Sequence, residues 1–60
     1  MSADRNYSTL LLDNAIRELR EARDHVRHEK LEKAETDIGK ALKYMGKALV
    51  EIQKIEKGRG

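Results

Sequence analysis

The stretch Ile38–Val50, IGKALKYMGKALV, contains the phrase GKAL twice, at 39–42 and at 46–49. The copies are seven residues apart, which is the spacing of a helical heptad. Lettering the heptad a to g from residue 31 gives three apolar rows: Leu31, Ile38, Met45 and Ile52 in a, Ala34, Ala41, Ala48 and Ile55 in d, and Leu42 and Leu49 in e. The repeat predicts an amphipathic helix with small residues along row d.

A second heptad precedes this one, with Leu12, Leu19 and Val26 in row a, Ala15 and Ala22 in row d, and Ile16 in row e. Row a passes from Val26 to Leu31 in five residues, a phase jump that would put the two apolar stripes of one continuous helix on different sides. A turn at 28–30 lets both stripes face inward. The fold class predicted is all-α, an antiparallel helical hairpin with helices at about 6–28 and 31–57.

The ends of these helices are less marked in the sequence. Ser8 is the predicted N-cap of the first helix, with Asn6 or Asp4 as alternatives, because their side chains accept hydrogen bonds from free amide groups. The predicted turn lacks Gly and Pro, and Thr36-Asp37 is a competing break with better capping chemistry. Gly58 is a predicted helix stop, and 58–60 are expected to fray.

Composition limits how such a chain can be stabilised. Sixty residues make one domain, 1–60, near the lower limit for a self-sufficient core. Cysteine is absent, which excludes disulfides and thiolate metal sites. Charged residues make up 40% of the chain with a net charge of only +2, and proline is absent. This mixture favours salt-laced helices, stabilised by regular helix packing or by association with another chain.

Small residues indicate a close contact between the two helices. Alanines in row d allow helix axes to approach near the short end of the usual range. Gly39 and Gly46 suggest the same, unless they are incidental surface glycines, because a helical glycine costs roughly 0.5–1 kcal/mol relative to alanine. The predicted helix-packing seam is Leu12, Ala15, Leu19, Ala22, Val26, Leu31, Ala34, Ile38, Ala41, Met45 and Ala48.

One hairpin leaves apolar side chains beside that seam and at the overhanging end of the second helix. The predicted association surface is Leu10, Leu11, Ile16, Leu42, Leu49, Ile52 and Ile55. Such a surface needs a cover, and a second copy related by two-fold symmetry is the economical one. The sequence predicts a homo-oligomer, with a dimeric four-helix bundle favoured, acting as an adaptor, chaperone-like binder or accessory subunit. Recognition of one larger partner by a single helix in a groove is a third alternative.

Lysines provide an alternative function. Lys33, Lys40, Lys47 and Lys54 recur every seven residues, with Lys43 nearby, and could contact the phosphates of RNA or DNA. Glutamates on the same helix and the single neighbouring aromatic, Tyr44, favour a solvated helix face instead.

Candidates for chemistry are few. His25 and His28, with Glu21 and Glu29, could bind a divalent ion, but their flanking polar positions favour exposed side chains. We therefore expect no metal and no cofactor. No phosphate-binding glycine loop, cysteine nucleophile or triad is present, so a non-enzymatic protein is expected. The start is polar and no apolar run approaches the roughly 20 residues of a membrane helix, so we expect a cytoplasmic protein without membrane contact.

Part of the chain resembles a known class of helical proteins. RHEKLEKAE at 27–35, leading into DIGKALKYM at 37–45, is similar to helix pairs in flagellin-type export chaperones and other small bundle proteins. The resemblance spans one hairpin, 10–45, whereas those chaperones carry more helices. It implies a packed helix pair and no functional residue.

Overall fold

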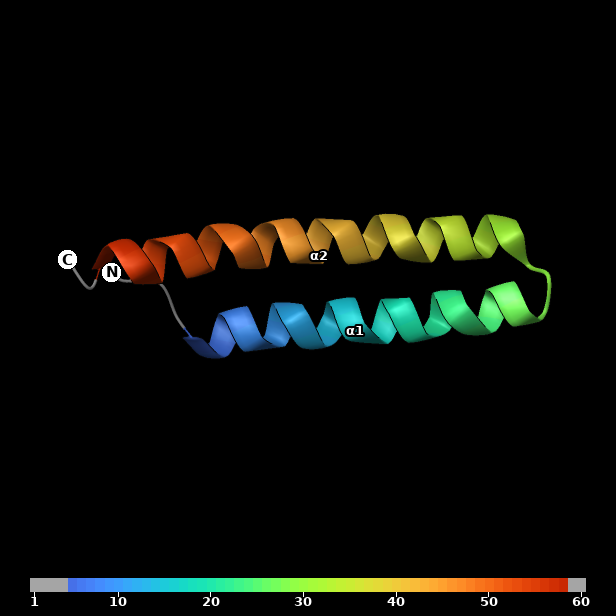
Figure 1. Ribbon diagram of the computed structural model, residues 1–60. Coiled ribbons are helices and arrows are strands. Elements are labelled where there is room, and N and C mark those ends of the chain that lie inside the picture. The colour runs from blue at the N-terminus through green and yellow to red at the C-terminus, as the bar shows by residue number, and fades with distance from the viewer. Residues whose placement is uncertain (1–4, 59–60) are drawn as a thin grey trace.

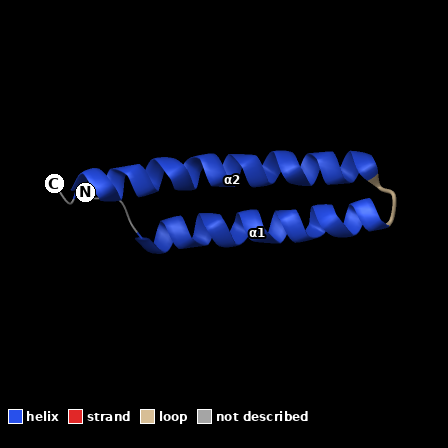
Figure 2. Cartoon of the chain, viewed as in Figure 1, coloured by secondary structure: helices blue, strands red, loops and turns tan. Residues whose placement is uncertain are grey.

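A computed structural model describes residues 5–58 and consists of two helices joined by a short turn (Figure 1). Helix α1 spans Arg5–Arg27 and α2 spans Leu31–Gly58. The two helices lie side by side and antiparallel, and no strand occurs in the described residues (Figure 2). The predicted helical hairpin is therefore confirmed. The expectations for Asp4 and for residues 59–60 lie outside the described residues.

The turn at 28–30 is the predicted one, and α2 runs unbroken through the competing site at 36–37. Glu29 has a positive φ of 60°. Its amide donates to the carbonyl of Val26 at 3.0 Å, and the amide of Lys30 donates to the carbonyl of His25 at 2.7 Å. This pair of bonds is the Schellman motif, which normally places glycine at the left-handed position. Glu29 stands in that position here, so the turn carries no compositional signal.

The N-cap prediction for the first helix is wrong for Ser8 and Asn6. Ser8 and Asn6 both lie inside α1, whose described part begins at Arg5. Ser8 is buried and belongs to row d with Ala15 and Ala22. A small residue is needed at that position because row d faces α2, so packing rather than capping accounts for the serine.

The contact between α1 and α2, called the seam from here on, is built from rows d and g. The buried side chains are Ser8, Leu11, Ala15, Glu18 and Ala22 from α1 and Ala34, Asp37, Ala41 and Ala48 from α2. Ala41 has no exposed surface. Three buried residues are polar or charged, and among the described residues no large side chain is completely buried. The seam is thus narrow, rich in alanine and partly polar.

Row a does not lie in the seam, contrary to the prediction. Its members Leu12, Leu19, Val26, Leu31, Ile38 and Met45 are between 36% and 60% exposed. Consecutive residues of a helix are about 100° apart, so rows g and d form one face and row a falls on its flank. The apolar stripe of each helix is three rows wide, and only row d of it meets the neighbouring helix.

Candidate functional site: an uncovered apolar face and a cluster of acidic side chains

The large apolar side chains outside the seam gather on one side of the hairpin. Both helices use rows d and g for their contact and run antiparallel, so their a rows must lie on the same side. Row e extends this side on each helix. We define the apolar face as rows a and e: Leu12, Ile16, Leu19 and Val26 of α1, and Leu31, Ile38, Leu42, Met45, Leu49 and Ile52 of α2; all are exposed in the single chain.

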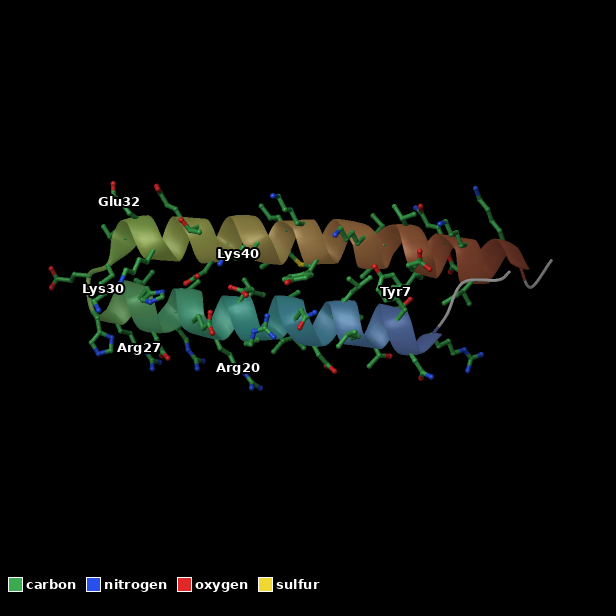
Figure 3. The ribbon with its side chains drawn as sticks, turned by 180° about the vertical axis from the view of Figure 1, so that it is seen from behind. Tyr7, Arg20, Arg27, Lys30, Glu32 and Lys40 are labelled. Carbon is green, nitrogen blue, oxygen red and sulfur yellow. The ribbon has the colours of Figure 1, made fainter. Side chains whose placement is uncertain are left out.

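Labelled side chains support this orientation of the two helices. Figure 3 shows Arg20 and Arg27 pointing away from α2, and Glu32 pointing away from α1. All three belong to row b, which lies opposite the d and g contact on a helical wheel. The side with rows a and e therefore lies between the seam and these outward charges.

The predicted association surface only partly coincides with the apolar face. Ile16, Leu42, Leu49 and Ile52 belong to it and are exposed. Leu11 is 4% exposed, because it lies in row g within the seam. Leu10 is exposed in row f, on the outward side, and Ile55 is half-buried in row d. In the described residues the branched aliphatic and methionine side chains are otherwise exposed, so Leu11 and Ile55 are the exceptions.

The glycines do not allow close approach within the hairpin. A Cβ atom added at Gly39 or Gly46 would meet nothing within 4 Å. Both residues belong to row b of α2, which faces away from α1. The close-approach prediction is therefore wrong for this contact, and the alternative of surface glycines describes the single chain.

The lysine row lies on the side opposite the apolar face, in row c of α2. Lys40, Lys43 and Lys47 surround Tyr44 and line a shallow hollow of about 150 Å³. Lys54 lies 3.5 Å from Glu51, a weak contact at the surface. Lys33 is exposed near the turn.

Acidic side chains meet across the seam near its middle. Glu18, Glu21 and Asp37 each bring one carboxylate oxygen within 4.8 Å of the others. The Asp37 carboxylate lies 2.6 Å from His25 Nδ1, and these side chains are 9% and 29% exposed. Arg17 Nη2 donates to Glu18 Oε2 at 3.3 Å, and this hydrogen bond raises the pKa of the Arg17 guanidinium above its ordinary value.

This cluster differs from the ion site that sequence reasoning considered. His28 and Glu29 are exposed at the turn, and His28 Nδ1 lies 2.8 Å from the backbone carbonyl of Asp24. Glu18 and Asp37 were missed because charged residues in row g are normally assigned to the solvent. No signal within one helix reveals them, because rows a and g lie equally close to row d on a helical wheel.

Comparisons of the chain with models of known families, with curated proteins and with solved structures find no match. Within residues 5–58 neither helix combines the length and apolar character needed to span a membrane.

Proposed function

We propose that this chain is a non-enzymatic protein-interaction module whose hairpin binds a second copy of itself through the apolar face, giving a four-helix bundle. The observation that carries the proposal is the mismatch between what the hairpin buries and what it leaves exposed. Its seam buries alanines and Leu11, while ten large apolar side chains of rows a and e stay exposed. Monomeric proteins rarely leave so large a continuous apolar surface in water.

The free energy of burial also favours association. Ordering a residue costs roughly 1–2 kcal/mol of backbone entropy, and alanine side chains return little of it. Complete burial of one Leu, Ile or Met side chain returns about 1.5–3 kcal/mol. When a second copy covers the apolar face, each apolar side chain of the face contributes part of this burial free energy, and it does so in both copies. Association therefore supplies the core that one hairpin lacks.

Charge favours a second copy as the occupant of the face and suggests its orientation. On α1 the apolar face is bordered near the turn by Arg20, Arg23 and Arg27 of rows b and e. On α2 the corresponding border holds Glu32 and Glu35. If the two-fold axis runs parallel to the helices, α1 of each copy packs on α2 of the other copy. Both turns then lie at the same end of the bundle. The basic border of each copy then meets the acidic border of the other, which fixes register and orientation.

Sedimentation equilibrium together with circular dichroism over a concentration series tests the association. We expect dimers that lose mass and helix together on dilution, because folding and association depend on the same apolar surface. A monomer that stays helical and thermally stable at low concentration would refute the proposal. A monomeric, poorly ordered chain would refute self-association as well, and would favour one larger partner binding the apolar residues.

Spin labels test the orientation. The chain contains no cysteine, so Lys30→Cys introduces a single label beside the turn. With both turns at one end, the two labels of a dimer lie close together. With turns at opposite ends, they lie apart by about the length of the hairpin, 47 Å. A mixture of Lys30→Cys and Lys57→Cys chains is the control. Its heterodimers should reduce the share of short distances in the first arrangement and introduce short distances in the second.

A nucleic-acid-binding dimer is the second candidate, and the hollow formed by Lys40, Lys43, Lys47 and Tyr44 favours it. The lysines would contact phosphates and the tyrosine ring could stack on a base. A mobility-shift titration with RNA and DNA should then show binding that falls steeply with salt and is lost in Lys40→Gln/Lys47→Gln. Lys30→Gln/Lys57→Gln removes the same charge at exposed positions outside the hollow and should change binding little. No shift at low salt would eliminate this candidate.

A further inference from the structure

We propose that Glu18, Glu21 and Asp37 form a binding site for one hard divalent cation within each hairpin. This inference goes beyond self-association, because every ligand comes from a single chain. The site spans the seam, with two carboxylates from α1 and one from α2. The alanines beside it, Ala15, Ala22, Ala34 and Ala41, are buried and bring the helices close enough for the carboxylates to meet.

The three carboxylates are close enough together for one cation to contact all of them after small side-chain movements. Oxygen ligands lie about 2.3–2.6 Å from Ca²⁺ and about 2.0–2.1 Å from Mg²⁺, so two oxygens on one ion are at most about 5 Å apart for Ca²⁺ and about 4 Å apart for Mg²⁺. The oxygens of Glu18, Glu21 and Asp37 lie within 4.8 Å of one another. Like charges at this distance repel, and a cation between them turns the repulsion into attraction.

A buried oxygen atom is the independent sign of a ligand. The Glu18 side chain is 8% exposed, and its Oε1 is buried without a hydrogen bond from any described residue. Arg17 contacts the other oxygen, Oε2, and is itself 54% exposed. Buried carboxylate oxygens are normally hydrogen-bonded or coordinate a metal. A cation that Glu18 binds through Oε1 would satisfy this oxygen.

The donor set selects the class of ion. Carboxylates suit Mg²⁺, Ca²⁺ and Mn²⁺, whereas thiolate and imidazole ligands favour softer ions such as Zn²⁺. His25 lies against the Asp37 carboxylate and orients it, in the manner of an outer-shell partner. Glu21 is exposed, so water completes the coordination on that side.

Titration of the full chain with Mn²⁺, followed by electron paramagnetic resonance and calorimetry, tests the site. We expect one Mn²⁺ per chain, displaced by Mg²⁺ or Ca²⁺, and a rise in melting temperature with Mn²⁺ concentration. Glu18→Gln and Asp37→Asn should each weaken binding by roughly 10- to 100-fold or more, the range seen even for outer-shell partners. The matched controls Glu56→Gln and Asp13→Asn remove the same charge at exposed positions and should leave affinity unchanged.

The melting temperature without metal is a second measurement, and it distinguishes loss of metal binding from loss of folding. Without metal, Glu18→Gln should melt at a higher temperature than the unaltered chain, because a neutral amide replaces an unpaired buried carboxylate oxygen. The melting temperature of the same variant should no longer rise when Mn²⁺ is added. Absence of Mn²⁺ binding at millimolar concentration would overturn the proposal. So would equal binding in Glu18→Gln and Glu56→Gln, or binding of Zn²⁺ alone that is lost in His28→Gln.

Discussion

The seam and the apolar face lie side by side on the same two helices, yet they hold opposite kinds of residue. The seam contains alanines, one leucine and buried acidic groups such as Glu18 and Asp37. The apolar face contains the bulky side chains, which are about half exposed in the single chain. In most small proteins the bulky residues would be at the closest helix contact and the charged ones outside.

This difference shows how the wide apolar stripe of each helix is divided between two contacts, one with the other helix of the hairpin and one with a further surface. One helix can cover only one flank of the three rows d, a and e. Small residues in row d let α1 and α2 approach closely, which leaves rows a and e for another surface. The seam thus determines how the hairpin is shaped, and the apolar face offers most of the burial still available.

The largest expected effect comes from placing a charge on the apolar face. Ile38→Glu removes an apolar group worth about 1.5–3 kcal/mol per chain when buried and adds a carboxylate that must be desolvated. We expect dimers to dissociate and helix content to fall, measured by sedimentation equilibrium and circular dichroism at equal concentrations.

Val50→Glu is the matched control for this change. Val50 is 48% exposed and Ile38 is 44% exposed, so the two side chains are buried to nearly the same extent in the single hairpin. Val50 belongs to row f, on the outward side, and its substitution should leave the sedimentation and the melting curve nearly unchanged. Equal effects of the two variants would mean that rows a and e are not the covered side.

Overpacking of the seam should have the next largest effect. Ala41 has no exposed surface, so Ala41→Leu must push α1 and α2 apart or force strained rotamers, at a cost of roughly 1–3 kcal/mol. Urea unfolding measures this loss of stability. Val50→Leu also enlarges a side chain of α2 but at an exposed position, and should stay within about 0.5 kcal/mol. An Ala41→Leu variant as stable as the unaltered chain would show that the alanine seam is not closely packed.

Much of the hairpin could be predicted from the sequence, because its elements follow from periodicity. The heptads defined both helices, and the phase jump between Val26 and Leu31 located the turn despite the lack of glycine. Helix rotation could not be predicted in the same way. A stripe of rows d, a and e can contact the neighbouring helix through either flank. Hydrophobicity alone favours burial of row a, which holds the bulkiest side chains, against that helix.

The acidic cluster was missed for a related reason. A charged residue in row g is buried only if the hairpin closes on that flank, and local sequence does not distinguish the two flanks. The pairing of His25 with Asp37 joins residues twelve apart across the turn, so no spacing within one helix reveals it. The ligand geometry emerges only when α1 and α2 are both in place.

The turn contains one strained backbone position, Glu29, whose φ is 60°. A residue other than glycine in the left-handed region costs roughly 1–2 kcal/mol, of which glycine would recover part after its own entropic cost. Glu29→Gly should therefore stabilise the hairpin by about 1 kcal/mol without altering the dimer, as measured by urea unfolding and sedimentation. Lys30→Gly, one residue further on, should give no such gain. Destabilisation by Glu29→Gly would indicate that the glutamate side chain itself holds the turn.

The smallest expected effect comes from replacing the glycines beside the apolar face, and it tests where that face ends. Gly39 lies in row b beside row e, and a Cβ there meets nothing within 4 Å in the single chain. Gly39→Ala should therefore raise stability by about 0.5–1 kcal/mol through helix propensity alone, with no change in sedimentation. Gly46→Ala, one heptad later, should behave in the same way. If either alanine instead weakens the dimer, the second copy packs closely against row b, and the covered surface is wider than rows a and e.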